Sequence, residues 1–170
     1  MLSSANKLAG AGADFLICPD NTIHKALPFV LPRSPLPWLH IAEVVASEAA
    51  SLGFGRLGLI GTRWLVESKV YPERLAARSL EYLQPNAAEL DETNRIIMDE
   101  LVYGDFRPES TAVFQRVIDR MKIEGCDAVV LGCTEIPLII SDANSALPTL
   151  DSTRLLARAA LRRAVDGSSR

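Results

Sequence analysis

Two loops of the sequence present side chains that can exchange protons, and the stretches that contain them resemble each other. Residues 125–135 read GCDAVVLGCTE, and residues 12–22 read GADFLICPDNT. When the stretches are aligned at their first glycines, each has an aspartate two residues on and then four apolar residues, and Asp20 falls opposite Cys133. A carboxylate accepts a proton, and a thiolate is a base or a nucleophile. The pair predicts two similar loops that face a shared cleft and carry different reactive groups.

Cys133 has the sequence surroundings of a reactive thiol. It follows an apolar run that is typical of a buried strand, and it lies near the start of an expected helix. A helix N-terminus stabilises a thiolate and lowers the pKa of the thiol. The adjacent Thr134 adds a hydroxyl, and neighbouring amides can hold a carboxylate. Cys18 lies inside an expected strand and Cys126 precedes one, so both are predicted to be small buried hydrophobic residues.

The elements that position these loops alternate between helices and short strands. Strands joined by helical segments of about 10–15 residues are typical of βαβ units with a parallel sheet. Ligands bind such sheets outside the carboxyl ends of the strands, which is where both loops lie. The expected strands are 14–18, 56–61, 79–84, 127–131 and 147–150, the expected helices are 2–10, 41–52, 86–102, 109–124 and 151–164, a further helix begins at Thr62, and 27–37 is an expected loop.

The likeness of the two stretches has a plainer explanation as well. Every strand–loop–helix unit needs an apolar strand and a polar turn, so such units resemble each other by default. Only the glycine and the aspartate are identical between residues 12–22 and 125–135. The alignment alone therefore leaves open whether the chain contains a true internal repeat.

Composition excludes several classes of function. The chain has 170 residues, of which 48% are hydrophobic and 23% are charged, as in ordinary soluble globular proteins. Its net charge of −3, with Lys and Arg scattered, provides no surface for nucleic acid. No apolar run approaches the roughly 20 residues that span a bilayer, and the first residues do not read as a signal peptide. Three cysteines without close pairing favour a reducing compartment, so the sequence predicts a cytoplasmic protein without nucleic-acid or membrane partners.

The sequence offers little for a metal ion or a nucleotide cofactor. It contains two histidines and no Cys-x-x-Cys pair, which is too few ligands for a typical metal site. The stretch GFGRLG (53–58) matches the dinucleotide-binding glycine pattern, but it precedes a strand, whereas that motif follows one. We therefore expect no metal and no cofactor. His24, which follows Asn21 and Thr22, is expected to help orient its loop.

The two loops and the segments between them resemble the aspartate/glutamate/hydantoin racemase superfamily. Its second cysteine motif reads roughly Gly-Cys-Thr-Glu, and its first usually reads Cys-Asn-Thr with a His two residues on. The matching stretches, which cover nearly the whole chain, are ICPDNTIHKA (17–26), LHIAEVVASEA (39–49), LGLIGTRW (57–64), DELVYGDFRPES (99–110), VVLGCTEIPLII (129–140) and LPTLDSTRLLARAAL (147–161).

The resemblance implies a cofactor-independent amino-acid racemase. Members use two acid–base groups, one on each face of the substrate's α-carbon, so that one removes the proton and the other returns it. Carried over to this sequence, Cys133 is one of these groups and Asp20 occupies the place of the other. The implied substrate is an amino acid or a related carboxylate, and the implied assembly is a homodimer. The candidate substrate-binding residues are Asn21, Thr22, Thr62, Thr134 and Glu135.

The resemblance also implies an α/β fold of two pseudo-symmetric flavodoxin-like lobes with parallel sheets. We expect the first lobe to comprise residues 1–36 together with 146–170, and the second to comprise 37–145. Members normally begin with a strand, a glycine-rich turn and a helix ahead of the helix that starts here at Met1. One such unit, on the order of 30–60 residues, is therefore expected to be absent, which makes the first lobe incomplete.

Two residues depart from the family pattern. Asp20 stands where the first motif usually has Cys, and an aspartate before an asparagine can instead begin a turn or cap a helix. Tyr103 stands where aspartate-specific members commonly carry a basic residue, which weakens the case for aspartate as the substrate. Two alternatives to a racemase stay open. One is a one-cysteine isomerase or decarboxylase, and the other is a truncated binding protein with weak or no catalysis.

Overall fold

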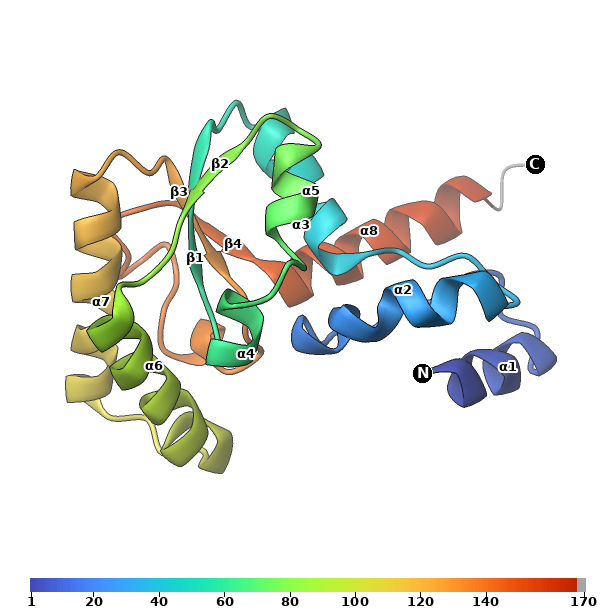
Figure 1. Cartoon of the computed structure of the whole chain (residues 1–170), viewed down its shortest axis with the longest axis horizontal. Helices are drawn as coiled ribbons and strands as arrows, with labels where there is room; N and C mark the ends of the chain where they lie inside the picture. The colour runs from blue at the N-terminus through green and yellow to red at the C-terminus, as the bar shows by residue number, and fades with distance from the viewer. Residues whose placement is uncertain (168–170) are drawn as a thin grey trace.

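A four-stranded parallel sheet forms the centre of the chain (Figure 1). The computed structural model describes residues 1–167. The strands are β1 (Arg56–Ile60), β2 (Glu81–Leu83), β3 (Ala128–Leu131) and β4 (Thr149–Asp151). Their order across the sheet is β2-β1-β3-β4, and in the central pair Leu57 lies opposite Ala128 and Ile60 opposite Leu131. The α/β class that the sequence predicts is confirmed.

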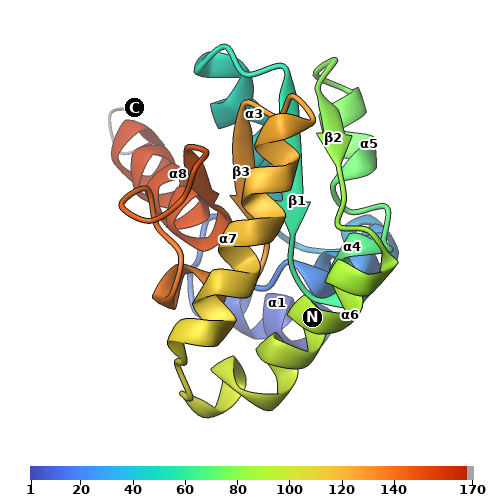
Figure 2. The same ribbon diagram turned by 90° about the vertical axis from the view of Figure 1, so that its left-hand side faces the viewer.

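Helices cover both faces of this sheet. They are α1 (Leu2–Gly10), α2 (Leu27–Val30), α3 (Ile41–Ser51), α4 (Arg63–Val66), α5 (Pro72–Ala76), α6 (Ala87–Asp99), α7 (Pro108–Ile123) and α8 (Ser152–Gly167), with the 3-10 helices η1 (Thr22–Ala26), η2 (Leu31–Arg33), η3 (Leu101–Tyr103) and η4 (Ile136–Leu138). Figures 1 and 2 show α6 and α7 on one face of the sheet and α3 and α5 on the other, with α8 packed against α3. The sheet is therefore the middle layer of three.

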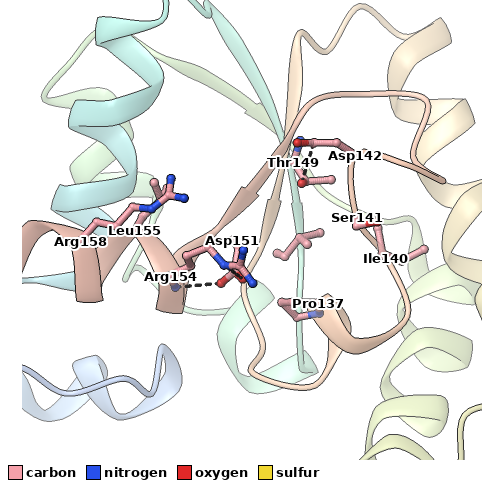
Figure 3. Close-up of a pocket in the computed structure, with 10 residues that line it drawn as sticks. Pro137, Ile140, Ser141, Asp142, Thr149, Asp151, Arg154, Leu155 and Arg158 are labelled. Atoms are coloured by element: carbon pink, nitrogen blue, oxygen red, sulfur yellow. Dashed lines mark hydrogen bonds and ion pairs between the residues drawn. The ribbon is translucent and has the colours of Figure 1, made fainter.

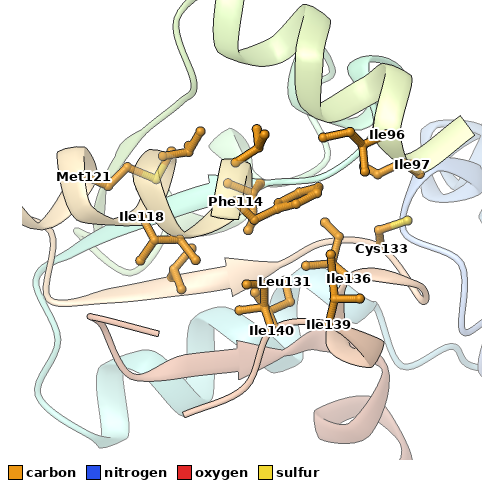
Figure 4. Packing of buried hydrophobic residues seen from close by; sticks show 14 of the residues in the cluster. Ile96, Ile97, Phe114, Ile118, Met121, Leu131, Cys133, Ile136, Ile139 and Ile140 are labelled. Atoms are coloured by element: carbon orange, nitrogen blue, oxygen red, sulfur yellow. The ribbon is translucent and has the colours of Figure 1, made fainter. Parts of the chain in front are cut away.

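Alternate side chains of β3 enter two separate hydrophobic clusters, one on each face. Val129 and Leu131 pack with Phe114 on the side of α7 (Figure 4). Ala128 and Val130 pack on the side of α3. All four residues of β3 are buried, which agrees with the continuous apolar run expected of a strand covered on both faces.

Four helices end with the same turn before the chain enters the next extended segment. The turn places a residue in the left-handed region, with φ of 89° at Gly12, 78° at Gly53, 88° at Gly125 and 55° at Ser79. In each case the next residue donates its backbone N–H to a carbonyl five residues earlier, a hydrogen bond that terminates a helix. The matched glycines of residues 12–22 and 125–135 thus belong to a general helix stop. Their identity does not by itself indicate an internal repeat.

Three local expectations are wrong. Residues 14–18 do not form a strand, because among residues 1–167 only Leu16 finds a partner, in a single parallel bridge to Trp38. The expected loop at 27–37 contains α2 and η2, whose prolines lie in the first helical turn, where a missing N–H costs nothing. The helix expected from Thr62 is broken into the short α4 and α5.

The C-terminal strand joins the central sheet. β4 pairs with β3, so this part of the expected first lobe hydrogen-bonds to the sheet of the expected second lobe. The segment 1–36 contributes helices and the Leu16 bridge. The division into two lobes stays a prediction, and residues 168–170 of the expected first lobe lie outside the described residues. Within residues 1–167, no helix has the length and apolar character that crossing a membrane requires.

Candidate functional site

A cavity of about 250 Å³ opens at the carboxyl ends of β1 and β3. Residues 19–22, which lead into η1, Thr62, two residues after β1, and the loop after β3 all contribute to its wall. Its lining residues are Pro19, Asp20, Asn21, Thr22, Thr62, Gly132, Cys133, Thr134 and Glu135. The structure therefore brings together all the residues that the sequence predicts for the site, at the edge of the sheet where ligands are expected.

A second cavity, of about 220 Å³, lies beside the outer strand β4 and holds none of the predicted site residues (Figure 3). Its two acids are engaged in local structure. Asp142 accepts hydrogen bonds from the backbone N–H and the hydroxyl of Thr149, and Asp151 accepts one from the backbone N–H of Arg154. These contacts fix the ends of a short edge strand, so the acids of this cavity have a structural role.

Two glycines allow the strands to bring Cys133 into the first cavity. A Cβ atom on Gly132 would lie 2.5 Å from Cδ2 of Leu65 and 2.9 Å from the carbonyl oxygen of Ile60. A Cβ atom on Gly61 would lie 3.1 Å from the carbonyl oxygen of Gly132. The ends of β1 and β3 approach each other too closely for side chains here, and the backbone N–H of Gly132 donates to Ile60 at 2.8 Å. Cys133 is held at the junction of the cavity and the apolar cluster (Figure 4).

Cys133 carries a protonated thiol, not the thiolate expected from the sequence. Burial first, and then the hydrogen bond to Glu135, raise the pKa of Cys133 to about 12. The thiol donates to Oε2 of Glu135 at 2.9 Å. The backbone N–H groups of Glu135 and Ile136 act in the opposite direction but are outweighed. The expected lowering of the pKa is wrong because the next helix is η4, a single 3-10 turn of three residues, and the thiol is 9% exposed.

Glu135 faces Cys133 across this hydrogen bond. Burial opposes ionisation of Glu135, but hydrogen bonds from Cys133 and from the hydroxyl of Thr134 prevail, so its pKa lies below the ordinary value. The carboxylate thus keeps a negative charge beside a neutral thiol at neutral pH. This charge disfavours loss of the thiol proton, and it also repels a second carboxylate in the cavity.

Asp20 is exposed and serves in part as a cap. Its Oδ1 accepts the backbone N–H of Ile23 at 3.0 Å, as expected if an aspartate at this position caps a helix. Among residues 1–167, Oδ2 makes no hydrogen bond, and the side chain lines the cavity. The cap does not use the whole carboxylate, so a role in proton transfer stays a prediction.

Three threonines provide the hydroxyl groups of the cavity. Thr22 and Thr62 meet at 3.3 Å between their Oγ1 atoms, which joins the loop before η1 to the end of β1. Thr62 does not use its side chain to cap α4, although its position before the helix suggested that it would. Thr134 is exposed at the mouth. The Thr134 hydroxyl donates to Glu135, so the Thr22–Thr62 pair is the one placed to donate a proton to a substrate carboxylate.

Asn21 is placed differently from the threonines. Its side chain is only 3% exposed, and both ends of its amide are engaged inside the protein. Oδ1 accepts the hydroxyl of Tyr71 at 2.7 Å, and Nδ2 donates to the hydroxyl of Ser152 at 2.9 Å. Sequence reasoning missed Tyr71 and Ser152, which lie 50 and 131 residues from Asn21 and carry no motif of their own.

His24 orients the loop that carries Asp20, as the sequence suggested. Its Nε2 accepts the backbone N–H of Ile41 at 3.3 Å, so its Nδ1 carries the proton and donates to the carbonyl of Asp20 at 2.8 Å. Burial is the main cause that lowers the pKa of His24, which keeps the ring neutral for this arrangement. Residues 1–167 contain no group of three side chains suited to a metal ion.

Comparisons with known proteins agree with this fold. A profile of the Asp/Glu/hydantoin racemase family matches residues 1–160. The crystal structure of a putative Asp/Glu racemase from Yersinia pestis is 32% identical, with a TM-score of 0.90 over 96% of this chain and 71% of that one. An aspartate racemase homologue from Pyrococcus horikoshii is 30% identical, with a TM-score of 0.87 over 96% of this chain and 72% of that one.

Curated relatives are more distant in sequence. A broad-specificity amino-acid racemase, RacX, from Bacillus subtilis is 22% identical over 93% of this chain and 68% of its own length. A glutamate racemase from Desulforudis audaxviator is 27% identical over 82% of this chain and 52% of its own length. The chain therefore spans about half the length of the glutamate racemase that it matches.

Proposed function

The chain belongs to the Asp/Glu/hydantoin racemase family, and we propose that its cavity racemises an amino acid without a cofactor, through Asp20 and Cys133. The observation that carries this proposal is that a carboxylate and a thiol from two different loops line one small cavity together with three hydroxyl groups. Racemisation needs an acceptor and a donor of protons on opposite faces of one carbon atom. The two loops supply one group each.

The protonation states of the cavity suggest the order of the steps. At neutral pH the thiol of Cys133 is protonated, because its pKa is raised to about 12. The carboxylate of Asp20 therefore takes the α-proton of the substrate, and the thiol gives its own proton to the opposite face of the carbanion. The products are the other enantiomer, a neutral Asp20 and a Cys133 thiolate. Release of the proton of Asp20 to solvent and uptake of a proton from solvent by the thiolate then restore the starting state for another turnover.

The polar groups of the cavity favour an amino acid with an uncharged side chain. Charge accumulates on the substrate carboxylate as the α-proton leaves, and donors placed there stabilise it. The hydroxyl pair of Thr22 and Thr62 supplies such a donor in this proposal, because only one of its two protons is used between them. The lining holds two acids, Asp20 and Glu135, and, as far as residues 1–167 are concerned, no cationic side chain. The acids suit the substrate ammonium group and disfavour a second carboxylate, which argues against aspartate and glutamate.

We further propose that the chain acts as a cytoplasmic homodimer of two-lobed subunits, 1–36 with 146–170 and 37–145. Its cysteines are all free, which suits a reducing compartment. Several large apolar side chains of the first 33 residues are exposed, among them Phe29 at 82% and Leu8 at 49%. Apolar surface of this kind commonly marks an interface.

A chiral assay tests the racemase proposal. Single enantiomers of alanine, serine, aspartate and glutamate are incubated with the purified chain, and the opposite enantiomer is measured by chiral chromatography. We expect turnover of an uncharged amino acid to exceed turnover of aspartate and glutamate. Cys133→Ser should abolish it, whereas Cys126→Ala, which alters a thiol outside the cavity, should retain it. Turnover of no amino acid by the folded chain, or full turnover by Cys133→Ser, would refute the proposal.

A second candidate function is decarboxylation followed by protonation on one face. It is favoured by the single thiol of the cavity, since one protonated thiol is enough to deliver a proton to a carbanion from one side. Incubation with 2-substituted malonates tests it. Release of carbon dioxide that depends on Cys133, without racemisation of any amino acid, would replace the first proposal with this one.

A further inference from the structure

A chain of buried hydrogen bonds joins the two loops of the cavity behind its wall. The hydroxyl of Tyr71 donates to Oδ1 of Asn21 at 2.7 Å. Nδ2 of Asn21 donates to the hydroxyl of Ser152 at 2.9 Å, and that hydroxyl donates to the carbonyl oxygen of Leu131 at 2.8 Å. A carbonyl oxygen can only accept, so the hydroxyl of Ser152 must donate to Leu131 and accept from Nδ2 of Asn21. Oδ1 of Asn21 is then the acceptor for Tyr71.

The members of this chain come from distant parts of the sequence and are almost completely buried. Tyr71 and Ser152 are 0% exposed and Asn21 is 3% exposed. Tyr71 precedes α5, Ser152 begins α8, Leu131 ends β3, and Asn21 precedes η1. A polar group withdrawn from water is costly unless it is hydrogen-bonded, so each bond of the chain is kept in place by the penalty for breaking it.

Two members of this hydrogen-bonded chain, Asn21 and Leu131, lie next to the two reactive groups. Asn21 follows Asp20 directly, and Leu131 precedes Cys133 by two residues. Gly132, between Leu131 and Cys133, is itself hydrogen-bonded to Ile60 at 2.8 Å, so this segment is held on both sides. A displacement of the Asp20 loop relative to β3 would have to break the bond between Asn21 and Ser152 or the bond between Ser152 and Leu131.

We propose that Tyr71 and Ser152 are positioning residues that set the spacing between Asp20 and Cys133 by holding Asn21. The inference rests on the proposed function in that the spacing matters for proton transfer to opposite faces of one carbon atom. Neither Tyr71 nor Ser152 lines the cavity, so neither touches the substrate. Their effect on catalysis passes through Asn21, whose side chain is engaged with both of them.

Tyr71→Phe and Ser152→Ala test the proposal by removing one hydroxyl each. Misplacement of a reacting group by about 1 Å can cost on the order of a hundredfold in rate. We expect kcat for racemisation to fall at least about tenfold in each variant, with KM changed less than about threefold, because neither hydroxyl touches the substrate. Tyr82→Phe, which removes the hydroxyl of a tyrosine on β2, should match the wild type.

Two further readouts separate positioning from general loss of structure. The number of inversions per α-proton exchanged with D2O should fall in both variants. The reactive group of one loop still removes the α-proton, but the group of the other loop is misplaced and returns a proton to the opposite face less often. The kcat of the double variant should be no lower than that of the slower single variant, since both hydroxyls act through Asn21. A merely destabilised enzyme would keep the inversion-to-exchange ratio of the wild type.

Hydrogen–deuterium exchange of the backbone tests the same inference without any turnover. In Tyr71→Phe and Ser152→Ala, amides of residues 19–24 and 132–135 should exchange faster than in the wild type, while those of α7 stay unchanged. If one variant fails to fold, the other decides. Unchanged kcat, inversion ratio and amide exchange in a folded variant would overturn the inference. A wild type that racemises nothing would refute the proposed function, and the amide exchange alone would then decide whether the two hydroxyls hold the loops.

Discussion

The chemical state of Cys133 depends on the residue two positions further along the chain. The thiol donates to Oε2 of Glu135 at 2.9 Å, and the carboxylate keeps its charge because its pKa is lowered by hydrogen bonds that outweigh its burial. A negative charge at this distance disfavours a thiolate. The charge of Glu135 thus keeps the thiol of Cys133 protonated, so that the thiol can donate a proton. It is a determinant of reactivity as well as a wall of the cavity.

Glu135→Gln should make Cys133 more reactive towards alkylation. Loss of the charge lowers the pKa of Cys133 from its value of about 12, although burial continues to raise it. At a fixed pH below that pKa, the thiolate fraction and the labelling rate grow about tenfold for each unit by which the pKa falls. Labelling with iodoacetamide at about pH 8.5, followed by peptide mapping, measures the change. Glu109→Gln, an exposed substitution outside the cavity, is the matched control and should label at the wild-type rate.

Equal labelling of Cys133 in the wild type and in Glu135→Gln would contradict this electrostatic role. The comparison between the wild type and Glu135→Gln also controls for access to the thiol, because Glu and Gln have side chains of nearly the same size. Faster labelling of Cys126 alone would indicate unfolding instead, since that thiol is buried in the core.

At the scale of residues, the identity of the cavity wall could be predicted and its chemistry could not. Asp20, Thr22 and Cys133 line one cavity as expected. Cys133 does so for the expected reason, because it follows β3 at the carboxyl edge of the sheet, whereas the strand expected ahead of Asp20 and Thr22 does not form. The raised pKa of Cys133 depends on burial and on a through-space contact, neither of which the spacing of residues reveals. The partners of Asn21 were missed for the same reason.

At the scale of elements, the helix stops show one sequence choice that departs from the others. Gly12, Gly53 and Gly125 occupy the left-handed turn position, where glycine has no steric penalty. Ser79 occupies the same position after α5 with a φ of 55°. A residue with a Cβ atom is strained in this region by roughly 1–2 kcal/mol. The connection from α5 to β2 is therefore less favourable than its three counterparts.

Ser79→Gly should stabilise the fold for this reason. We expect the free energy of unfolding to rise by about 0.5–1 kcal/mol, the relief of strain being partly offset by the greater freedom of glycine in the unfolded chain. Urea denaturation followed by circular dichroism measures it. The matched control is Ala77→Gly in the same turn, where φ is −62°, so that glycine gains nothing and should destabilise. Destabilisation of the same size by both substitutions would show that Ser79 is unstrained.

Elements could be predicted where the sequence pattern alone decides them. The strands at 56–61 and 127–131 were found because their apolar runs are buried on both faces by helices that the sequence also shows. Residues 14–18 have the same apolar pattern but form only the Leu16 bridge. A strand needs a neighbour along its length, and the pattern of one segment does not say whether a neighbour is present.

At the scale of the whole molecule, exposed apolar side chains gather in the first 33 residues. They are Leu8, Ile17, Ile23, Phe29 and Leu31, with exposed fractions between 39% and 82%. Single exposed apolar residues are ordinary, whereas apolar surface that is contiguous commonly marks an interface. In the proposed homodimer the side chains of this segment are buried between subunits.

Phe29→Ser should therefore weaken self-association. Sedimentation equilibrium over a dilution series measures the monomer–dimer constant, and we expect it to shift at least about tenfold towards monomer, since a buried Phe contributes about 1.5–3 kcal/mol. Ile123→Ser is the matched control, because Ile123 is 86% exposed at the end of α7, outside the N-terminal segment. A wild type that is monomeric at every concentration would contradict the homodimer, as would equal effects of the two substitutions.

Exchange of the substrate α-proton in D2O reports each proton-transferring group separately, so it distinguishes the role of Asp20 from that of Cys133. The amino acid that is racemised fastest is supplied as either pure enantiomer, and loss of its α-proton signal is followed by nuclear magnetic resonance. With Asp20 and Cys133 on opposite faces, the wild type should exchange both enantiomers. Asp20→Asn and Cys133→Ser should each keep exchange from one enantiomer, and not from the same one. Equal loss of exchange from both enantiomers in Asp20→Asn would show that Asp20 is only a cap, and would contradict proton transfer by the two loops.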